Sequence, residues 1–289
     1  MHAQTIDSEG CRFNVALDGP VDAPGLVLSN SLGASLDMWR PQVAAFARHF
    51  RVLRYDTRGH GRSGVTPGPY TIGQLAADVL RLVDAARLER VSFCGLSLGG
   101  ATGLWLAAHA AGRFERFVFC NTVPWLGPAE ALRSRAAAVR RDGLGGLVDA
   151  TMDRWFTPDF RVRDPQAVAD IRAAFLATPV EGYAACCEAL AGFDERASLP
   201  TIRSPVLVVA GTDDPAPPLG AARDYAAKIA GARFVELPTA HLSNLGAVAR
   251  FNAEVLRFLG EGIGEREYGR VAGGASPLPH RGRGRAKRG

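Results

Sequence analysis

The pentapeptide Gly95-Leu96-Ser97-Leu98-Gly99 has the pattern Gly-x-Ser-x-Gly, and its surroundings predict how the chain folds. The apolar run Val91-Ser92-Phe93-Cys94 precedes it and is typical of a short buried strand. The stretch Ala101–Ala110, rich in alanine and leucine, follows it and predicts a helix. A serine between strand and helix lies on a sharp, strained turn that needs small neighbours. We therefore predict that Ser97 is a nucleophile, with an idle serine in a glycine-rich loop as the alternative.

The same turn predicts an oxyanion hole. The backbone N–H of Leu98, at the N-terminus of the predicted helix, can donate a hydrogen bond to a developing oxyanion. A second donor is expected from the loop 29–33, which follows a predicted buried strand at Leu26–Leu28, and Leu32 is the candidate. In the same loop, Asn30 either shapes the turn or contacts substrate.

Length and composition indicate one large α/β domain with an insertion. The chain has 289 residues, of which 47% are hydrophobic, enough for a sizeable core. Its net charge of +5 comes from residues 262–289, which hold seven basic and two acidic side chains. Residues 1–261 are therefore neutral overall and show no basic stripe, so we expect no binding of nucleic acid by the folded part. The basic tail is predicted to be disordered.

Several classes of protein are disfavoured. The N-terminus resembles no secretory signal, and no apolar run is long enough to span a membrane. The five cysteines are odd in number and lack the spacing of metal ligands, which predicts reduced thiols in a cytoplasmic protein. We predict neither a metal nor an organic cofactor, and the sequence leaves the oligomeric state open.

The alternation of short apolar runs with helical stretches predicts a doubly wound, mostly parallel sheet formed by residues 1–122 and 198–261. Residues 123–197 contain no predicted strand and form an all-helical cap over the carboxyl edge of the sheet, where ligands bind. The helices expected in the cap lie near 129–141, 144–156, 165–177 and 181–191. A last helix is expected over 244–259.

A nucleophilic serine needs a general base and an acid that orients the base. Both partners are expected later in the chain, each just after a strand. His241 follows the predicted strand Phe234–Leu237, and an acid follows the strand that ends at Ala210. Asp213 and Asp214 both fit, and the Gly-x-x-Asp turn favours Asp214.

The chain resembles the α/β-hydrolase superfamily over residues 1–261 and, within it, the 3-oxoadipate enol-lactonases. The stretches that carry the closer resemblance are Ser29-Asn30-Ser31-Leu32-Gly33, Arg154-Trp155-Phe156-Thr157-Pro158, Glu181-Gly182-Tyr183-Ala184 and His241-Leu242-Ser243-Asn244. Ser97, Asp214 and His241 fall on the catalytic triad of the family. The cap stretch Pro124–Arg135 and the tail beyond residue 261 depart from its pattern.

The resemblance implies hydrolysis of an enol lactone that bears a carboxylate, a reaction of the β-ketoadipate pathway of aromatic breakdown. Arg133 and Arg135 are candidates for binding that carboxylate, and Trp125 and Trp155 for the pocket wall; solvated arginines and core packing are the alternatives. Rival activities are a general carboxylesterase and a hydrolase of carbon–carbon bonds in ring-cleavage products. A non-enzymatic small-molecule sensor and binding of nucleic acid by the tail are further alternatives.

Overall fold

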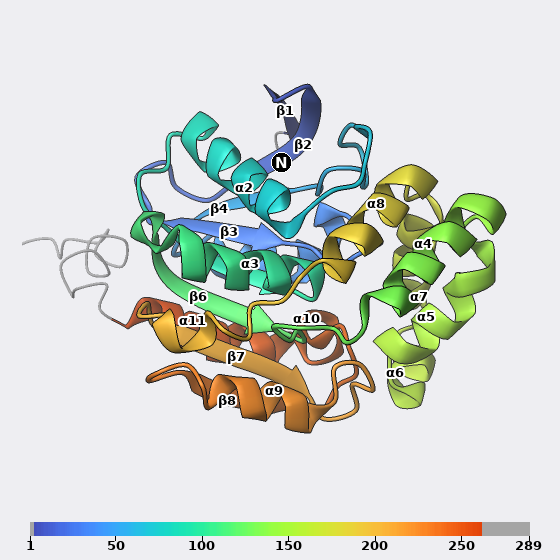
Figure 1. The fold of residues 1–289 in the computed structure, drawn as a ribbon. Helices are drawn as coiled ribbons and strands as arrows, with labels where there is room; N and C mark the ends of the chain where they lie inside the picture. The colour runs from blue at the N-terminus through green and yellow to red at the C-terminus, as the bar shows by residue number, and fades with distance from the viewer. Residues whose placement is uncertain (1–2, 262–289) are drawn as a thin grey trace, which may run out of the picture. The chain divides into compact units, whose positions relative to one another are not determined.

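The computed structural model describes residues 3–261, and the predicted basic tail lies outside them. One sheet of eight strands has the order β1-β2-β4-β3-β5-β6-β7-β8 (Figure 1). The first two strands form a hairpin, β2 pairs antiparallel with β4, and the remaining pairs are parallel. The strands are β1 (Ala3–Ser8), β2 (Cys11–Asp18), β3 (Gly25–Ser29), β4 (Arg51–Tyr55), β5 (Val91–Leu96), β6 (Phe114–Cys120), β7 (Val206–Gly211) and β8 (Arg233–Leu237).

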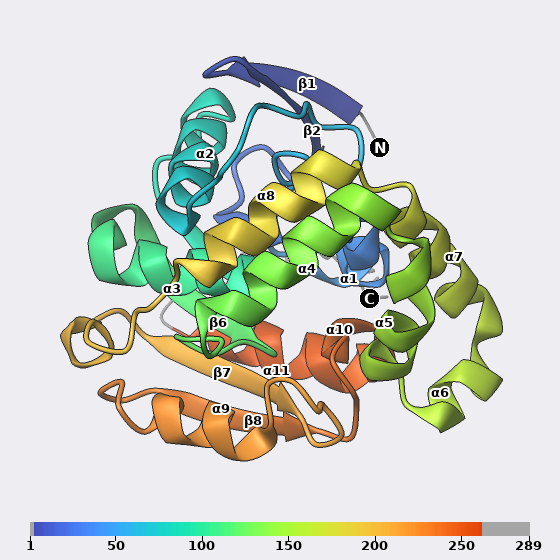
Figure 2. The same cartoon turned by 45° about the vertical axis from the view of Figure 1, so that its right-hand side comes forward.

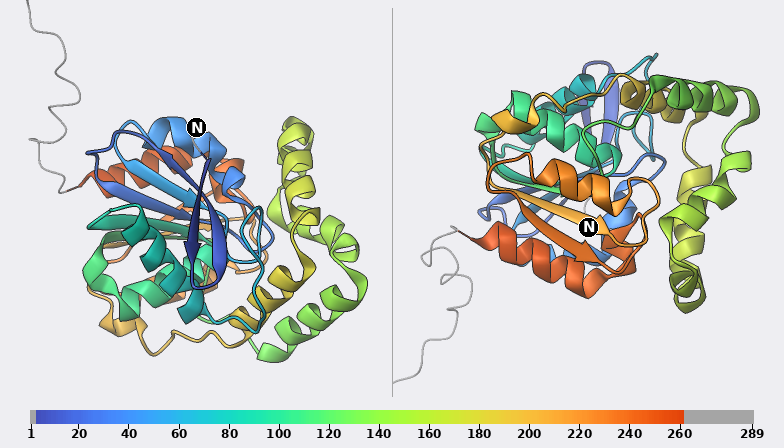
Figure 3. Two further views of the ribbon diagram at one scale, coloured as in Figure 1. Left: turned by 90° about the horizontal axis from the view of Figure 1, so that it is seen from above. Right: turned by 60° about the horizontal axis from the view of Figure 1, so that its bottom comes forward.

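Helices cover both faces of this sheet. α2 (Ile72–Ala85) and α3 (Leu98–His109) lie on one face, and α1 (Arg40–Phe46) and α11 (Val248–Gly260) lie on the other (Figures 1 and 3). Every residue of β3, β5 and β7 is buried, which explains why these strands are continuous apolar runs. α9 (Leu219–Ala226) packs against β7. The doubly wound sheet predicted from the sequence is confirmed.

One helix follows a short 3₁₀-helix, and one predicted helix is interrupted. The 3₁₀-helix η1 (Leu36–Trp39) precedes α1, which begins at Arg40 with Pro41 in its first turn, where the missing N–H costs nothing. The last helix, expected over 244–259, is divided into α10 (Ser243–Gly246) and α11. Ala247 divides them because its backbone, with φ −140° and ψ 55°, is not helical.

The segment between β6 and β7 supplies a layer of helices beyond the carboxyl ends of the strands (Figure 1). They are α4 (Ala129–Asp142), α5 (Val148–Trp155), α6 (Pro158–Arg163), α7 (Pro165–Leu176) and α8 (Val180–Ala191). α4 and α8 run side by side over the edge of the sheet (Figures 1 and 2). α6 was not predicted; it begins where the Thr157 hydroxyl accepts a hydrogen bond from the N–H of Phe160, with Pro158 in its first turn.

The remaining short elements are the 3₁₀-helices η2 (Ala111–Arg113), η3 (Gly145–Leu147) and η4 (Leu199–Thr201). Within residues 3–261, no helix is long and apolar enough to cross a membrane. All five cysteines are free and buried.

Candidate active site

Ser97 lies on the turn between β5 and α3 with a strained backbone (φ 57°, ψ −110°), a conformation rare for residues other than glycine. The turn is tight: a Cβ placed on Gly95 would lie 2.2 Å from the Gly99 oxygen, and one on Gly99 2.3 Å from the Ser29 oxygen. The Ser97 N–H donates to the Cys120 carbonyl at 2.9 Å, which ties the turn to the end of β6. The small residues of the pentapeptide are therefore required for close packing.

An acid–base pair lies in the loops that follow β7 and β8. The Nδ1 atom of His241 is 2.8 Å from Oδ2 of Asp214, and both side chains are buried. Oδ1 of Asp214 accepts the N–H of Ala216 at 3.0 Å, so the carboxylate is held from both sides. Asp213 is exposed, and its carboxylate accepts the Thr212 hydroxyl instead. Of the two adjacent acids, Asp214 is thus the one that faces the imidazole.

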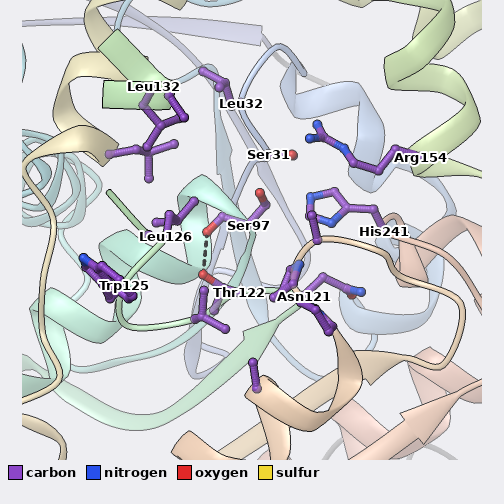
Figure 4. Close-up of a pocket in the computed structure, with 18 of the residues that line it drawn as sticks. Ser31, Leu32, Ser97, Asn121, Thr122, Trp125, Leu126, Leu132, Arg154 and His241 are labelled. Atoms are coloured by element: carbon purple, nitrogen blue, oxygen red, sulfur yellow. Dashed lines mark hydrogen bonds between the residues drawn. The ribbon is translucent and has the colours of Figure 1, made fainter. Parts of the chain in front are cut away.

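A cavity of about 460 Å³ brings these elements together. Ser97 and His241 both line it, and in Figure 4 their side chains face the same space. Its apolar walls come from the segment after β6, from the cap and from the loop after β7 (Val123, Trp125, Leu126, Gly127, Ala131, Leu132, Leu190, Ala216, Pro217, Pro218 and Ala221). A pocket of this size, mostly apolar with few polar groups, is typical of a small-molecule site.

Two arginines of the cap, Arg135 on α4 and Arg154 on α5, add positive charge to this cavity. Burial and the neighbouring charge of Arg135 lower the pKa of Arg154. The Nε atom of Arg154 is buried and has no hydrogen-bond partner within the described chain. The charge of Arg135 also acts on the hydroxyl of Tyr183, a neutral group that is buried nearby. A positively charged, incompletely paired group in the same cavity as Ser97 is suited to a carboxylate.

The other predicted binding residues lie in different surroundings. Trp125 lines the cavity and is 39% exposed, with the Arg196 guanidinium 4.1 Å from its ring centroid. Arg133 is exposed on α4 and is not among the residues that line this cavity. Asn30 is buried behind the loop, where its Nδ2 donates to the Tyr55 carbonyl at 2.7 Å.

Trp155 supports the site from outside the cavity. Its ring stacks on that of His241, with centroids 6.4 Å apart and an interplanar angle of 17°. Its carbonyl also accepts the N–H of Leu242 at 3.2 Å, so the end of α5 is bonded to the histidine loop. The cap is therefore linked to the acid–base pair by this residue.

The candidate oxyanion donors lie on either side of Ser97. Leu98 is the first residue of α3, so its N–H has no acceptor within the helix. Leu32 lines the cavity, and the next residue, Gly33, donates its N–H to Nε2 of His60 at 2.9 Å. Burial lowers the pKa of His60 to about 4, which keeps Nε2 available as an acceptor at neutral pH. A neutral histidine thus holds the loop that carries Leu32.

The sequence interpretation did not single out Arg154, Asn121 or Thr122 as site residues. Arg154 lies three residues after the buried Thr151 on α5, and this spacing could have placed it on the inner side of the helix. For Asn121 and Thr122 the available signal was their place after a buried strand, at the sheet edge that carries Ser97, Asp214 and His241. Among residues 3–261, no cluster of three or more histidine, cysteine or acidic side chains could hold a metal ion.

The mostly parallel sheet, the strained serine turn and the acid and histidine loops at the carboxyl edge define an α/β hydrolase. Residues 24–247 match the α/β-hydrolase fold family. The chain is also similar to 3-oxoadipate enol-lactonase 2 of Acinetobacter baylyi, with 40% identity across 87% of this chain and 94% of that protein. The family match shows that the chain is an α/β hydrolase, and the similarity to this relative shows that it belongs to the 3-oxoadipate enol-lactonase family. The chain is a carboxylic ester hydrolase.

Solved structures of an enol-lactonase and of an esterase both superimpose on the chain. The crystal structure of the enol-lactonase from Burkholderia xenovorans superimposes with a TM-score of 0.87 and 47% identity, covering 89% of this chain and all (100%) of that one. A thermophilic esterase from Thermogutta terrifontis, solved with malate bound, has a TM-score of 0.83 and 26% identity over 89% of this chain and 96% of that one.

Proposed function

We propose that this enzyme opens 3-oxoadipate enol-lactone to 3-oxoadipate, within the β-ketoadipate pathway of aromatic breakdown. The observation that carries the proposal is a single cavity that joins Ser97 and His241 to the two cap arginines. A lactone ring with a carboxylate arm needs both features: a nucleophile at its ester carbonyl and a cation at its far end. The enol-lactonase relatives support the same substrate.

In the proposed mechanism, His241 removes the hydroxyl proton of Ser97 as the serine oxygen attacks the lactone carbonyl. Asp214 holds the imidazole through its Nδ1–H and stabilises the imidazolium that forms. The N–H groups of Leu32 and Leu98 stabilise the tetrahedral oxyanion, each by about 3 kcal/mol. The C–O bond of the ring then breaks, and the enol, which stays attached to the acyl chain, tautomerises to the ketone.

Water completes the reaction. His241, having returned its proton to the leaving oxygen, accepts a proton from a water molecule that attacks the acyl-enzyme ester. The ester bond to Ser97 breaks, the serine recovers its proton, and the product leaves as a dicarboxylate. One water molecule is consumed for each lactone opened.

For substrate binding we assign Arg135 and Arg154 to the carboxylate, because both line the cavity on the cap side. Trp125 and Leu126 provide the apolar wall against which the ring packs. We assign the exposed Arg133 no contact with substrate. Asn30 acts through the shape of its loop, and Trp155 through its stacking on His241.

A general carboxylesterase is the second candidate, favoured by the likeness to the Thermogutta terrifontis esterase. The two are separated by comparing kcat/KM for authentic enol lactone, followed by its ultraviolet absorbance, with kcat/KM for neutral aryl esters such as p-nitrophenyl acetate. The lactonase should prefer its lactone by orders of magnitude. Equal or higher values for the aryl esters would overturn the proposal in favour of the esterase.

A further inference from the structure

Two adjacent residues at the carboxyl end of β6, Asn121 and Thr122, lie between the serine turn and the acid–base pair. Both are buried, and both line the cavity (Figure 4). Asn121 has a left-handed backbone (φ 48°), which asparagine tolerates better than most residues. The mechanism proposed above uses neither side chain.

Asn121 connects the acid to the loop that carries the base. Its Nδ2 atom donates to Oδ2 of Asp214 at 2.9 Å, the same oxygen that faces His241. Its Oδ1 atom accepts the Ser243 hydroxyl at 2.6 Å. An ionised carboxylate only accepts hydrogen bonds, so the amide must point its nitrogen at Asp214 and its oxygen at Ser243. The Asp214 carboxylate therefore fixes the orientation of the amide, and the Ser243 hydroxyl, two residues after His241, donates to the amide oxygen that this leaves free.

Thr122 connects the same point of the chain to the nucleophile. Its hydroxyl donates to the Ser97 carbonyl at 3.0 Å, the one hydrogen bond drawn in Figure 4. Its side chain packs on Gly100, where an added Cβ would lie 2.6 Å from the threonine Cγ2. Just before the pair, the Cys120 carbonyl accepts the Ser97 N–H at 2.9 Å. The strained turn is thus held by two residues of one strand end, Cys120 and Thr122.

We propose that Asn121 and Thr122 are positioning residues of the hydrolytic reaction, which together fix the Asp214–His241 pair relative to Ser97. Because they are neighbours on one strand end, the spacing between nucleophile and base is set by a single peptide unit. This inference rests on the triad mechanism proposed above.

The first test compares Asn121→Ala and Thr122→Val with two controls that lose similar bonds elsewhere. Asn14→Ala removes an amide–carboxylate bond of 2.7 Å to Asp56, and Thr151→Val removes a bond of 2.8 Å from the Thr151 hydroxyl to the Leu147 carbonyl, just before α5. Asn121→Ala should lower kcat about 100-fold with little change in KM, as expected for a displacement near 1 Å. Thr122→Val should lower kcat about tenfold. The controls should lower Tm and leave kcat at the wild-type value.

The second test uses Asn121→Asp, which can replace the amide donor only while its carboxyl group is protonated. The charged groups around this position are Asp214, His241 and, from the cap, Arg154. The adjacent Asp214 should raise the pKa of the new carboxyl group, so kcat relative to wild type should fall as the pH rises from about 5 to about 8. Asn14→Asp is the matched control, with a flat ratio expected.

The outcomes separate this inference from the proposed function. Wild-type protein that neither opens the lactone nor reacts with a fluorophosphonate would remove the triad mechanism itself. Wild-type turnover of lactone together with wild-type kcat in Asn121→Ala and Thr122→Val would overturn the positioning role alone. A flat pH ratio for Asn121→Asp, or an equal loss of kcat in the Asn14 and Thr151 controls, would also overturn it.

Discussion

The floor and the roof of the cavity are built in different ways. The floor consists of Ser97, Asn121, Asp214 and His241, which follow β5, β6, β7 and β8 in turn. The roof consists of the cap side chains that line the cavity, with Arg135 and Arg154 as its charged members. Each floor residue follows a strand whose register is fixed by parallel pairing, whereas the roof depends on how helices pack above it.

The floor and the roof also differ in how their charged groups are paired. On the floor, the carboxylate of Asp214 faces the imidazole of His241 and two further donors, from Asn121 and Ala216. On the roof, burial lowers the pKa of Arg154, and its Nε has no partner in the described chain. We infer that the floor determines which bond is broken and that the roof determines which molecule is admitted.

The largest effect should follow from removing the proposed nucleophile, Ser97. Ser97→Ala should lower kcat for the lactone by about 10⁶-fold, because the histidine then has no hydroxyl to activate. Binding of the product 3-oxoadipate, measured by calorimetry, should stay near the wild-type value because the roof is unchanged. A Ser97→Ala enzyme with more than about a thousandth of wild-type activity would show that another group attacks the lactone.

The second effect concerns the stability of the folded chain through His60, which bonds to the loop that carries Leu32. Its pKa is about 4 in the folded chain because of burial, against about 6.5 when exposed, so the unfolded chain binds more protons between these values. Stability should therefore fall as the pH drops from about 6.5 to about 4, by about 3 kcal/mol from this residue. His60→Gln keeps an acceptor for Gly33 and cannot titrate.

The measurement is the free energy of urea unfolding for wild type and His60→Gln across this pH range. The difference between the two proteins should change by about 3 kcal/mol in favour of the variant at low pH. The remaining titratable groups are the same in both proteins, so their contributions to the free energy of unfolding cancel in the difference. A constant difference would mean that His60 is protonated in the folded state or is exposed to water.

The floor could be predicted from the sequence because each of its members has a local signal. The glycines around Ser97 indicate a tight turn with no room for a Cβ atom at their positions. The residues that follow the apolar runs must lie together at one edge of a parallel sheet. Of two adjacent acids, Asp214 is buried because the turn after β7 directs it inward, and the Gly-x-x-Asp pattern anticipated this.

The roof could not be predicted to the same degree. Its arginines recur along several amphipathic helices, and a single sequence does not tell which of them a neighbouring helix will bury. Arg133 and Arg135 lie two positions apart on α4, yet Arg133 is exposed and Arg135 lines the cavity. The sequence also did not predict which distant residues form ion pairs. For example, Arg58, in a loop, bonds to the buried Asp78 of α2.

The third prediction tests the roof directly. Arg154→Met keeps most of the side-chain length but removes the cation, so kcat/KM for the carboxylate-bearing lactone should fall about 100-fold. The rate with a neutral aryl ester should change little or rise. Arg133→Met, on the exposed side of α4, is the control and should leave both rates unaltered. Equal losses on charged and neutral substrates would assign Arg154 to the structure of the site instead of to the substrate.

The smallest effect should come from the outer surface of the cap. There Arg140 of α4 bonds to Glu181 and Glu188 of α8, at 2.7 and 2.5 Å, with its side chain 35% exposed. These bonds hold the two helices side by side, but water screens them, so Arg140→Met should lower the free energy of unfolding by only about 1 kcal/mol. Added salt should reduce the difference further. α4 also carries Arg135, so a shift of this helix would change substrate binding. A rise in KM for the lactone without loss of kcat would show that this surface pairing controls the position of the roof. An unchanged KM would mean that the buried contacts between α4 and α8 are enough to hold the roof in place.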